Sequence, residues 1–123
     1  MSTIFELIEK VKREMYRAKV GMIVTHEGIV RDTSRDGFQV EYLDIDVDFQ
    51  VWESILEEMR AQKGIVALEA DIITGRRYVG QELLLIVIAG DFREHVFPVL
   101  EKTVNRLKNE AIVKKEKLLN GQF

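Results

Sequence analysis

The stretch Leu-Leu-Leu-Ile-Val-Ile-Ala at residues 83–89 is apolar at every position. A strand with one face in water alternates apolar and polar residues, so an unbroken apolar run of this length predicts a strand that is covered on both faces. The run is far shorter than the ~20 residues that a helix needs to cross a bilayer. We therefore expect residues 83–89 to form a central strand of a sheet.

Helices are predicted in the chain before this strand. Residues 4–17 start with a capping box, formed by Thr3 and Glu6, and repeat apolar residues at helical spacing. A second helix is expected to end at Gly64, because glycine suits the C-terminal cap of a helix. Its apolar stripe consists of Val51, Trp52, Ile55, Leu56 and Met59.

A third helix is expected after the central strand. Asp91 and Glu94 can cap its first turn, although Pro98 would bend a helix that begins so early. The alternative is a helix that starts nearer Phe97. The predicted apolar stripe consists of Val96, Phe97, Leu100, Val104 and Leu107.

The alternation of residues 20–31 predicts a strand. It is followed at 32–37 by a cluster of turn residues that ends in Asp-Gly, which is typical of a hairpin. The expected return strand is 38–47, and its apolar alternation slips by one residue. This slip predicts a bulge near Tyr42.

The remaining segments complete a mixed pattern of helices and strands. Residues 65–73 are predicted to form a strand and residues 74–80 an exposed connection, which gives the order α-β-β-α-β-β-α. Hairpins joined by a helix predict an α+β fold of two layers. At 123 residues the chain has room for one core, so we expect a single domain over residues 1–123.

The composition excludes several classes of function. Eighteen basic and 21 acidic side chains give a net charge of −3, which argues against a general nucleic-acid binder. Charged residues interrupt the N-terminal apolar positions, so we expect no secretory signal, no membrane association and a cytoplasmic protein. The chain has no Cys and two His. It therefore has no thiolate nucleophile, and we expect neither a metal site nor a resident cofactor.

Charge is unevenly distributed along the chain. Residues 102–117 hold six basic and two acidic residues, a balance of +4, whereas residues 38–59 hold seven acidic residues and no basic one. This asymmetry fits a surface that attracts anions. A solvated helix face with a tail, a docking site for an acidic protein, or a contact between the two segments in a dimer would use the same charges.

The sequence lacks a glycine-rich phosphate loop, a nucleophile elbow and a zinc-binding helix motif. Asp44 and Asp46 share a strand face, where we expect a solvated edge rather than catalysis. Arginine can bind a phosphate or carboxylate through two parallel hydrogen bonds, and lysine adds a mobile charge. The candidates that remain are basic: Arg31, Arg93, Lys108 and Lys115.

Several short motifs occur in order along the chain. They are Val24-Thr25-His26-Glu27-Gly28-Ile29-Val30-Arg31, then Gly75-Arg76 and Val79-Gly80-Gln81, then Arg93, Phe97, Leu107-Lys108 and Lys115. Each motif is short, and their combination is informative. Over about residues 21–117 it resembles the large, catalytic subunit of molybdopterin synthase, the MoaE family.

The resemblance implies an α/β-hammerhead fold and a homodimer within a heterotetramer. It implies a partner, a small ubiquitin-like sulfur-carrier subunit of the MoaD type, whose C-terminal Gly-Gly tail bears a thiocarboxylate. The implied reaction transfers sulfur to cyclic pyranopterin monophosphate and forms the dithiolene of molybdopterin. A sulfur donor outside the chain agrees with the absence of cysteine. The alternative is a divergent member of the same fold that binds a pterin, a phosphate or a protein without catalysis.

The resemblance also implies roles for individual residues. Lys108 and Lys115 match the two lysines of the last motifs and are both expected to be catalytic. Lys108 would hold the thiocarboxylate and stabilise negative charge as the acyl–sulfur bond breaks, and Lys115 would complete the anion pocket. Arg31 and Arg93 match arginines that would bind the phosphate or the polar edge of the pterin. His26 stands where the family usually has an aromatic residue. It is either a substrate-binding or proton-transfer group, or a hydrogen-bonded structural histidine.

The sequence departs from the family around the expected pocket. Phe92 replaces the His of a His-Arg pair, and Ile72-Ile73 replaces a second such pair. Ile112-Val113-Lys114 stands in place of a Pro-aromatic-Trp segment. The segment after Lys115, which in the family can reach a neighbouring protomer, runs to Phe123. These changes concern the expected pocket more than the expected fold.

Overall fold

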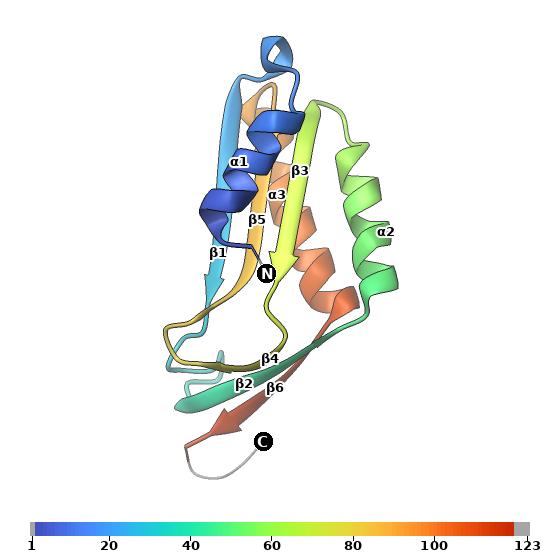
Figure 1. Cartoon of the computed structure of the whole chain (residues 1–123). Helices are drawn as coiled ribbons and strands as arrows, with labels where there is room; N and C mark the ends of the chain where they lie inside the picture. The colour runs from blue at the N-terminus through green and yellow to red at the C-terminus, as the bar shows by residue number, and fades with distance from the viewer. Residues whose placement is uncertain (1, 120–123) are drawn as a thin grey trace.

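The structure is a computed structural model that describes residues 2–119, and these form two antiparallel three-stranded sheets (Figure 1). The large sheet has the strand order β1-β5-β3, and the small sheet has the order β4-β2-β6. The strands of the large sheet are β1 (Met22–Ile29), β3 (Ile65–Ile72) and β5 (Glu82–Gly90). Those of the small sheet are β2 (Val40–Val47), β4 (Gly75–Tyr78) and β6 (Ile112–Leu118).

Helices cover both faces of the large sheet. One face is packed against α1, and the other against α2 and α3 (Figure 1). The hydroxyl of Thr3 accepts a hydrogen bond from the Glu6 backbone N–H, so α1 has its predicted cap. The predicted stripe of α2 is buried except for Val51, which is partly buried, and this helix ends four residues before Gly64. The helical segments are α1 (Ile4–Glu14), the 3₁₀ turn η1 (Arg17–Lys19), α2 (Phe49–Arg60), α3 (Arg93–Arg106) and the π-helical turn η2 (Leu107–Ala111).

The central position of β5 confirms the prediction from the apolar run. Leu84, Ile86 and Ile88 belong to the core on the side of α2 and α3. Leu85, Val87 and Ala89 belong to a second core beneath α1. All six side chains are completely buried, because alternate residues of a strand point to opposite faces and both faces are covered. The α+β class is therefore confirmed, with α1 forming a layer of its own.

The predicted hairpin between residues 20–31 and 38–47 is wrong. β1 pairs with β5, and β2 lies in the small sheet. The turn itself forms, since Thr33 and Gln39 make an isolated bridge, but beyond it the two strands diverge to bury their apolar faces in different places. The bulge near Tyr42 is confirmed by a shift in register between Val40 and Tyr42.

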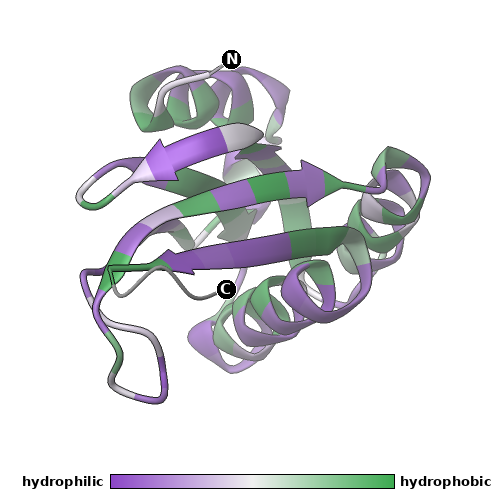
Figure 2. Cartoon of the chain, turned by 90° about the horizontal axis from the view of Figure 1, so that it is seen from below, coloured by the Kyte–Doolittle hydropathy of each residue, from purple (hydrophilic) through white to green (hydrophobic). Residues whose placement is uncertain are grey.

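Two strands of the small sheet were not predicted. The segment 74–80, which was expected to be an exposed connection, contains β4. The first residue of this strand is Gly75, whose φ is +86°. The basic segment after α3 contains β6, which Figure 2 shows as mostly hydrophilic. A strand with one open face needs few apolar residues, so neither segment has the pattern of a buried strand. Residues 120–123, the end of the segment that follows Lys115, lie outside the described residues.

The third helix differs in detail from the prediction. It begins at Arg93, so the alternative start near Phe97 is wrong. The Asp91 carboxylate accepts a hydrogen bond from the next backbone N–H and lies 2.8 Å from the ring of His95, and it does not cap the first turn. Phe97 is 52% exposed. The buried face of the helix consists of Val96, Val99 and Thr103.

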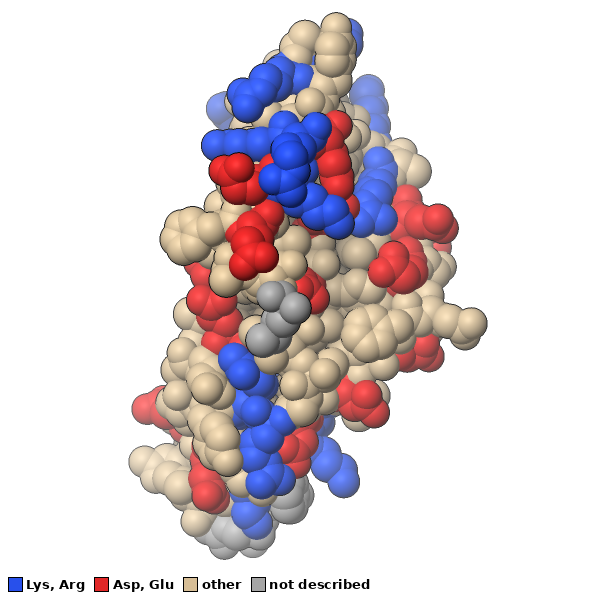
Figure 3. Space-filling view, in the orientation of Figure 1, with Lys and Arg blue, Asp and Glu red and all other residues tan. Residues whose placement is uncertain are grey.

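The surface carries charge of both signs. On the face shown in Figure 3, basic side chains gather over α1 and again over the small sheet, with acidic side chains between them. Within residues 2–119, no helix combines the length and the apolar character that a membrane span requires.

Candidate anion-binding site

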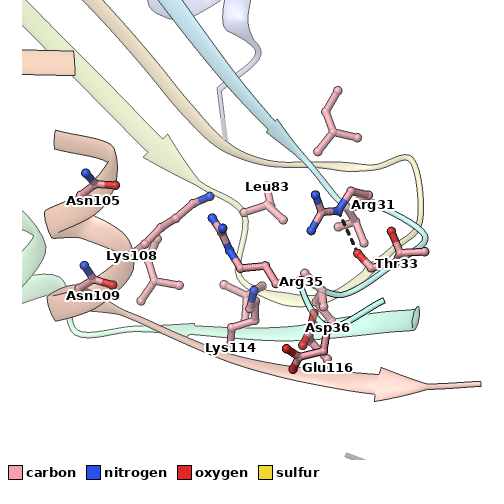
Figure 4. Close-up of a pocket in the computed structure, with 15 residues that line it drawn as sticks. Arg31, Thr33, Arg35, Asp36, Leu83, Asn105, Lys108, Asn109, Lys114 and Glu116 are labelled. Carbon is pink, nitrogen blue, oxygen red and sulfur yellow. Dashed lines mark hydrogen bonds between the residues drawn. The ribbon is translucent and has the colours of Figure 1, made fainter. Parts of the chain in front are cut away.

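A pocket of about 560 Å³ lies where the end of the large sheet meets the small sheet. Its walls come from the end of β1 and the loop that follows, from β2 and β6, and from η2. Charged and amide side chains point into the same space (Figure 4). The apolar lining includes Val30, Leu43, Ile45 and Leu83.

Basic side chains outnumber acidic ones around this pocket. Four basic and two acidic residues line it, a balance of +2 in a chain whose net charge is −3. In the described part of the chain, Arg35, Lys108 and Lys114 form no ion pair. Cations that converge without a counter-ion create a site for an anion. The six charged residues are Arg31, Arg35, Lys108, Lys114, Asp36 and Glu116.

Lys108 lies on η2, and its side chain extends into the pocket towards Arg35 (Figure 4). Partial burial of the ammonium lowers the pKa of Lys108, and the nearby positive charges of Lys114, Arg35 and Arg31 lower it further. Both effects make the ammonium form less favourable than in a free lysine. A bound anion would reverse this effect, because an opposite charge within a few ångströms favours the ammonium.

Arg31 lines the same pocket as Lys108, so the structure brings these two predicted site residues together. The Arg31 side chain is oriented by a hydrogen bond from its Nε to the carbonyl of Thr33, at 2.9 Å. It lies two residues after the end of β1 and is exposed at one side of the pocket.

Lys115 does not line this pocket, because alternate residues of β6 face opposite ways. Lys114 pairs in register with Ile45, whose side chain is buried against the pocket, and Lys115 pairs with Asp44 on the outer face. The positive charge of Lys115 contributes to the lowered pKa of Asp44, after the larger effect of Arg76.

Arg93 also lies outside the pocket of its own chain. It is the first residue of α3, whereas Lys108 follows the last turn of that helix. Its side chain is 76% exposed and pairs with Glu94 at 3.4 Å.

His26 lies in β1, on the strand face that packs towards α2 and α3, and it does not line the pocket directly. Its Nε2 is buried and has no hydrogen-bond partner among the described residues, so the hydrogen-bonded structural role is not supported at this atom. The atom lies 3.4 Å from where a Cβ on Gly28 would be, along the strand towards the pocket. Burial lowers the pKa of His26, and the charge of Lys108 lowers it further.

Arg35 and Lys114 are pocket residues that the sequence analysis missed. Arg35 occurs in a cluster of turn residues, where a basic side chain is common and carries no signal. Lys114 belongs to the basic segment 102–117, but only the phase of β6 distinguishes it from Lys115. No three His, Asp or Glu side chains in residues 2–119 gather closely enough to hold a metal ion. The donors of the pocket are ammonium, guanidinium and amide groups, which suit an anion.

Comparisons with known proteins agree with this fold. A family model described as MoaE protein matches residues 3–110. A protein of Methanocaldococcus jannaschii described as uncharacterized is 27% identical over 99 residues, which are 77% of this chain and 83% of that protein.

Solved structures are similar in fold over most of their length. Molybdopterin synthase from Staphylococcus aureus has a TM-score of 0.74 at 20% identity, covering 93% of this chain and 85% of that one. The molybdopterin biosynthesis MoaE protein of Burkholderia ambifaria has a TM-score of 0.74 at 21% identity, covering 98% and 80%. A complex of subunits 1 and 2 of molybdopterin-converting factor from Helicobacter pylori has a TM-score of 0.70 at 22% identity, covering 97% and 81%.

Proposed function

The chain belongs to the MoaE family, which supports a role in molybdopterin biosynthesis, and on this premise we propose that it is the large subunit of a molybdopterin synthase. In this proposal two sulfur atoms, one from each of two thiocarboxylated carrier subunits, are transferred to cyclic pyranopterin monophosphate. Its cyclic phosphate opens, each carrier is left with a C-terminal carboxylate after hydrolysis, and the product is the dithiolene of molybdopterin. A partner subunit is supported by the Helicobacter pylori structure, which is a complex of two subunits.

The observation that carries the proposal is the position of Lys108. Its side chain lines one pocket together with three other cations, and none of Lys108, Arg35 and Lys114 has an ion-pair partner within residues 2–119. Such a pocket accepts an anionic guest, and both reactants of the proposed reaction are anions: a thiocarboxylate and a cyclic phosphate. Lys108 would bind the thiocarboxylate and stabilise the negative charge that develops as the acyl–sulfur bond breaks.

Other residues would bind and orient the substrate. Arg31 would bind the phosphate or the polar edge of the pterin, since its guanidinium has donors left after the bond to Thr33. Arg93 and Lys115 lie outside the pocket of their own chain. They belong to the proposal as residues that a second copy, in a homodimer, would contribute to the pocket of its neighbour. His26 does not line the pocket itself. It would serve as a hydrogen-bond or proton-transfer partner for the bound substrate.

The decisive experiment is sulfur transfer with the Lys108→Ala variant. Purified chain, thiocarboxylated carrier and cyclic pyranopterin monophosphate are combined, and the dithiolene product is measured. Removing one preorganised cation from a developing anion costs about 10²–10³-fold in rate, so we expect a loss of this order with no loss of thermal stability.

Lys12→Ala is the matched control, because it removes the same group from the exposed surface of α1. Equal activity of Lys108→Ala and the wild type would contradict the assigned role of Lys108. No product from the wild type would contradict the proposed enzyme, and binding of a pterin or phosphate without turnover would then favour the non-catalytic alternative.

A further inference from the structure

We propose that Lys114 and Arg35, which line the pocket beside Lys108, contact the substrate directly and bind its phosphate group. This inference rests on the proposed function for the identity of the substrate. It assigns to the pocket two residues that the resemblance to the family does not supply, and it makes Lys114, rather than Lys115, the second lysine of the pocket within one chain.

The phase of β6 carries the assignment of Lys114. Ile112, Lys114 and Glu116 face the pocket, so the intervening Lys115 points to the outer face of the small sheet. There Lys115 lies opposite Asp44, a carboxylate that is already bound by Arg76 through two hydrogen bonds. The two adjacent lysines therefore have different neighbours. Lys114 lines the pocket together with Arg35 and Lys108, and Lys115 lies opposite the Asp44 carboxylate.

The turn after β1 carries the assignment of Arg35. Ser34 is buried, its backbone N–H donates to the Phe38 carbonyl at 2.8 Å, and its hydroxyl accepts from the Phe38 N–H at 3.1 Å. Gly37 completes the turn at a φ of +87° and donates its N–H to the Ser34 carbonyl. These hydrogen bonds stabilise the turn, from which the guanidinium of Arg35 points into the pocket, close to Lys108 in Figure 4.

Mutual repulsion explains why these groups favour a phosphate. Lys114 and then Arg35 are the two largest charge effects that lower the pKa of Lys108, ahead of Arg31. Cations held together without an ion-pair partner gain when an anion binds between them, and a phosphate has enough oxygens to accept from the fork of Arg35 and from the ammonium of Lys114. Asp36 and Glu116 also line the pocket. Their carboxylates repel an anion and therefore favour its binding at the side of Lys108.

The test is binding of inorganic phosphate to the full chain in the absence of any carrier subunit, measured by NMR titration or calorimetry. A hydrogen bond to a charged group contributes enough to change affinity by about tenfold or more. We expect Lys114→Ala and Arg35→Ala each to weaken phosphate binding by at least this factor. Arg35→Lys, which keeps the charge and loses the fork, should fall between Arg35→Ala and the wild type. Lys12→Ala and Arg17→Ala are the matched controls, since both residues are exposed and lie in or just after α1.

The outcomes separate this inference from the proposed enzyme. Weakened phosphate binding in Lys115→Ala together with unchanged binding in Lys114→Ala would overturn the assignment of Lys114. Unchanged binding in Arg35→Ala, or no measurable phosphate binding by the wild type, would overturn the phosphate site. Weakened phosphate binding in the two variants of a wild type that makes no dithiolene would support the site and contradict the enzyme. In an active wild type, the KM for the pterin substrate should rise in both variants more than kcat falls.

Discussion

The large and the small sheet have the same number of strands but differ in what surrounds them. The large sheet is covered by helices on both faces, and its central strand β5 has six consecutive side chains, Leu84 to Ala89, that are completely buried. The small sheet has one face towards the core and the pocket, and its other face is exposed. Val113, in the edge strand β6 of the small sheet, is 63% exposed.

This difference distinguishes the large sheet, which stabilises the fold, from the region beside the small sheet, which can bind a ligand. Apolar burial contributes about 25 cal/mol per Å² of area, so β5 and its covering helices supply much of the free energy of folding. Cations with no partner contribute nothing comparable, and their mutual repulsion opposes folding. The pocket therefore occupies the boundary between the two sheets, where the large sheet compensates for the cost of holding Lys108, Arg35 and Lys114 together.

The strongest test of this division is a cavity in the large sheet. Ile86 is completely buried in the core between β5, α2 and α3. Ile86→Ala removes buried methyl and methylene groups and leaves a cavity, which costs about 2–5 kcal/mol. We expect the free energy of unfolding, measured by urea denaturation, to fall by this amount.

Val113→Ala is the matched change in the small sheet. Its side chain is mostly exposed on the outer face of β6, so we expect a loss below about 1 kcal/mol. Equal destabilisation by Val113→Ala and Ile86→Ala would contradict this difference between the two sheets. It would mean that the outer face of the small sheet is buried against another molecule.

The same contrast explains which parts of the fold the sequence predicts. The apolar run at residues 83–89 and the stripe of α2 depend only on burial, and both predictions are confirmed. The pairing of β2 with β4 and β6 joins segments far apart in the chain, and the local turn at 32–37 favours a hairpin that the whole molecule does not form. A polar strand with one exposed face, such as β6, has no apolar pattern from which it could be predicted.

The residues of the candidate site were likewise predicted only in part. Lys108 and Arg31 meet in one pocket, as the resemblance to the family implies. The phase of Lys114 and Lys115 could not be read from the sequence, because the π-helical turn η2 separates α3 from β6 and a shift of one residue exchanges the two faces of a strand. Arg35 reaches the pocket through the three-dimensional path of a loop, for which no local pattern exists.

His26 connects the two regions, since it lies in the large sheet and yet responds to the charge of Lys108. Its pKa is lowered in the folded chain by burial, so below its ordinary value of 6.5 the unfolded chain binds a proton that the folded chain resists. Stability from this source is present above pH 6.5 and is lost as the pH falls towards the folded pKa. In His26→Phe, which cannot titrate, we expect the melting temperature to fall less between pH 7.5 and pH 5.5 than in the wild type.

His26→Gln is the companion variant, because it keeps a polar group without titrating in this range. Both variants should show the flatter pH profile. A wild-type profile that runs parallel to that of His26→Phe would mean that His26 takes up its proton equally well in the folded chain, and that the large sheet does not shield it from the solvent.

The smallest effect is expected on the outer face of the small sheet. Arg76 binds the Asp44 carboxylate through Nε at 3.0 Å and Nη2 at 3.2 Å, and its guanidinium carbon lies 3.8 Å from the centre of the Tyr42 ring. These hydrogen bonds lower the pKa of Asp44, so they stabilise the fold above the ordinary pKa of a carboxyl group, and this contribution disappears as the pH falls through the lowered value. Both side chains remain open to solvent, which screens the pair. In Arg76→Ala we expect the pKa of Asp44, followed by NMR, to return towards its ordinary value, while the melting temperature at neutral pH falls only slightly. A clear loss of stability would show that the exposed ion pairs of the small sheet, and not only the buried strands of the large one, hold the fold together.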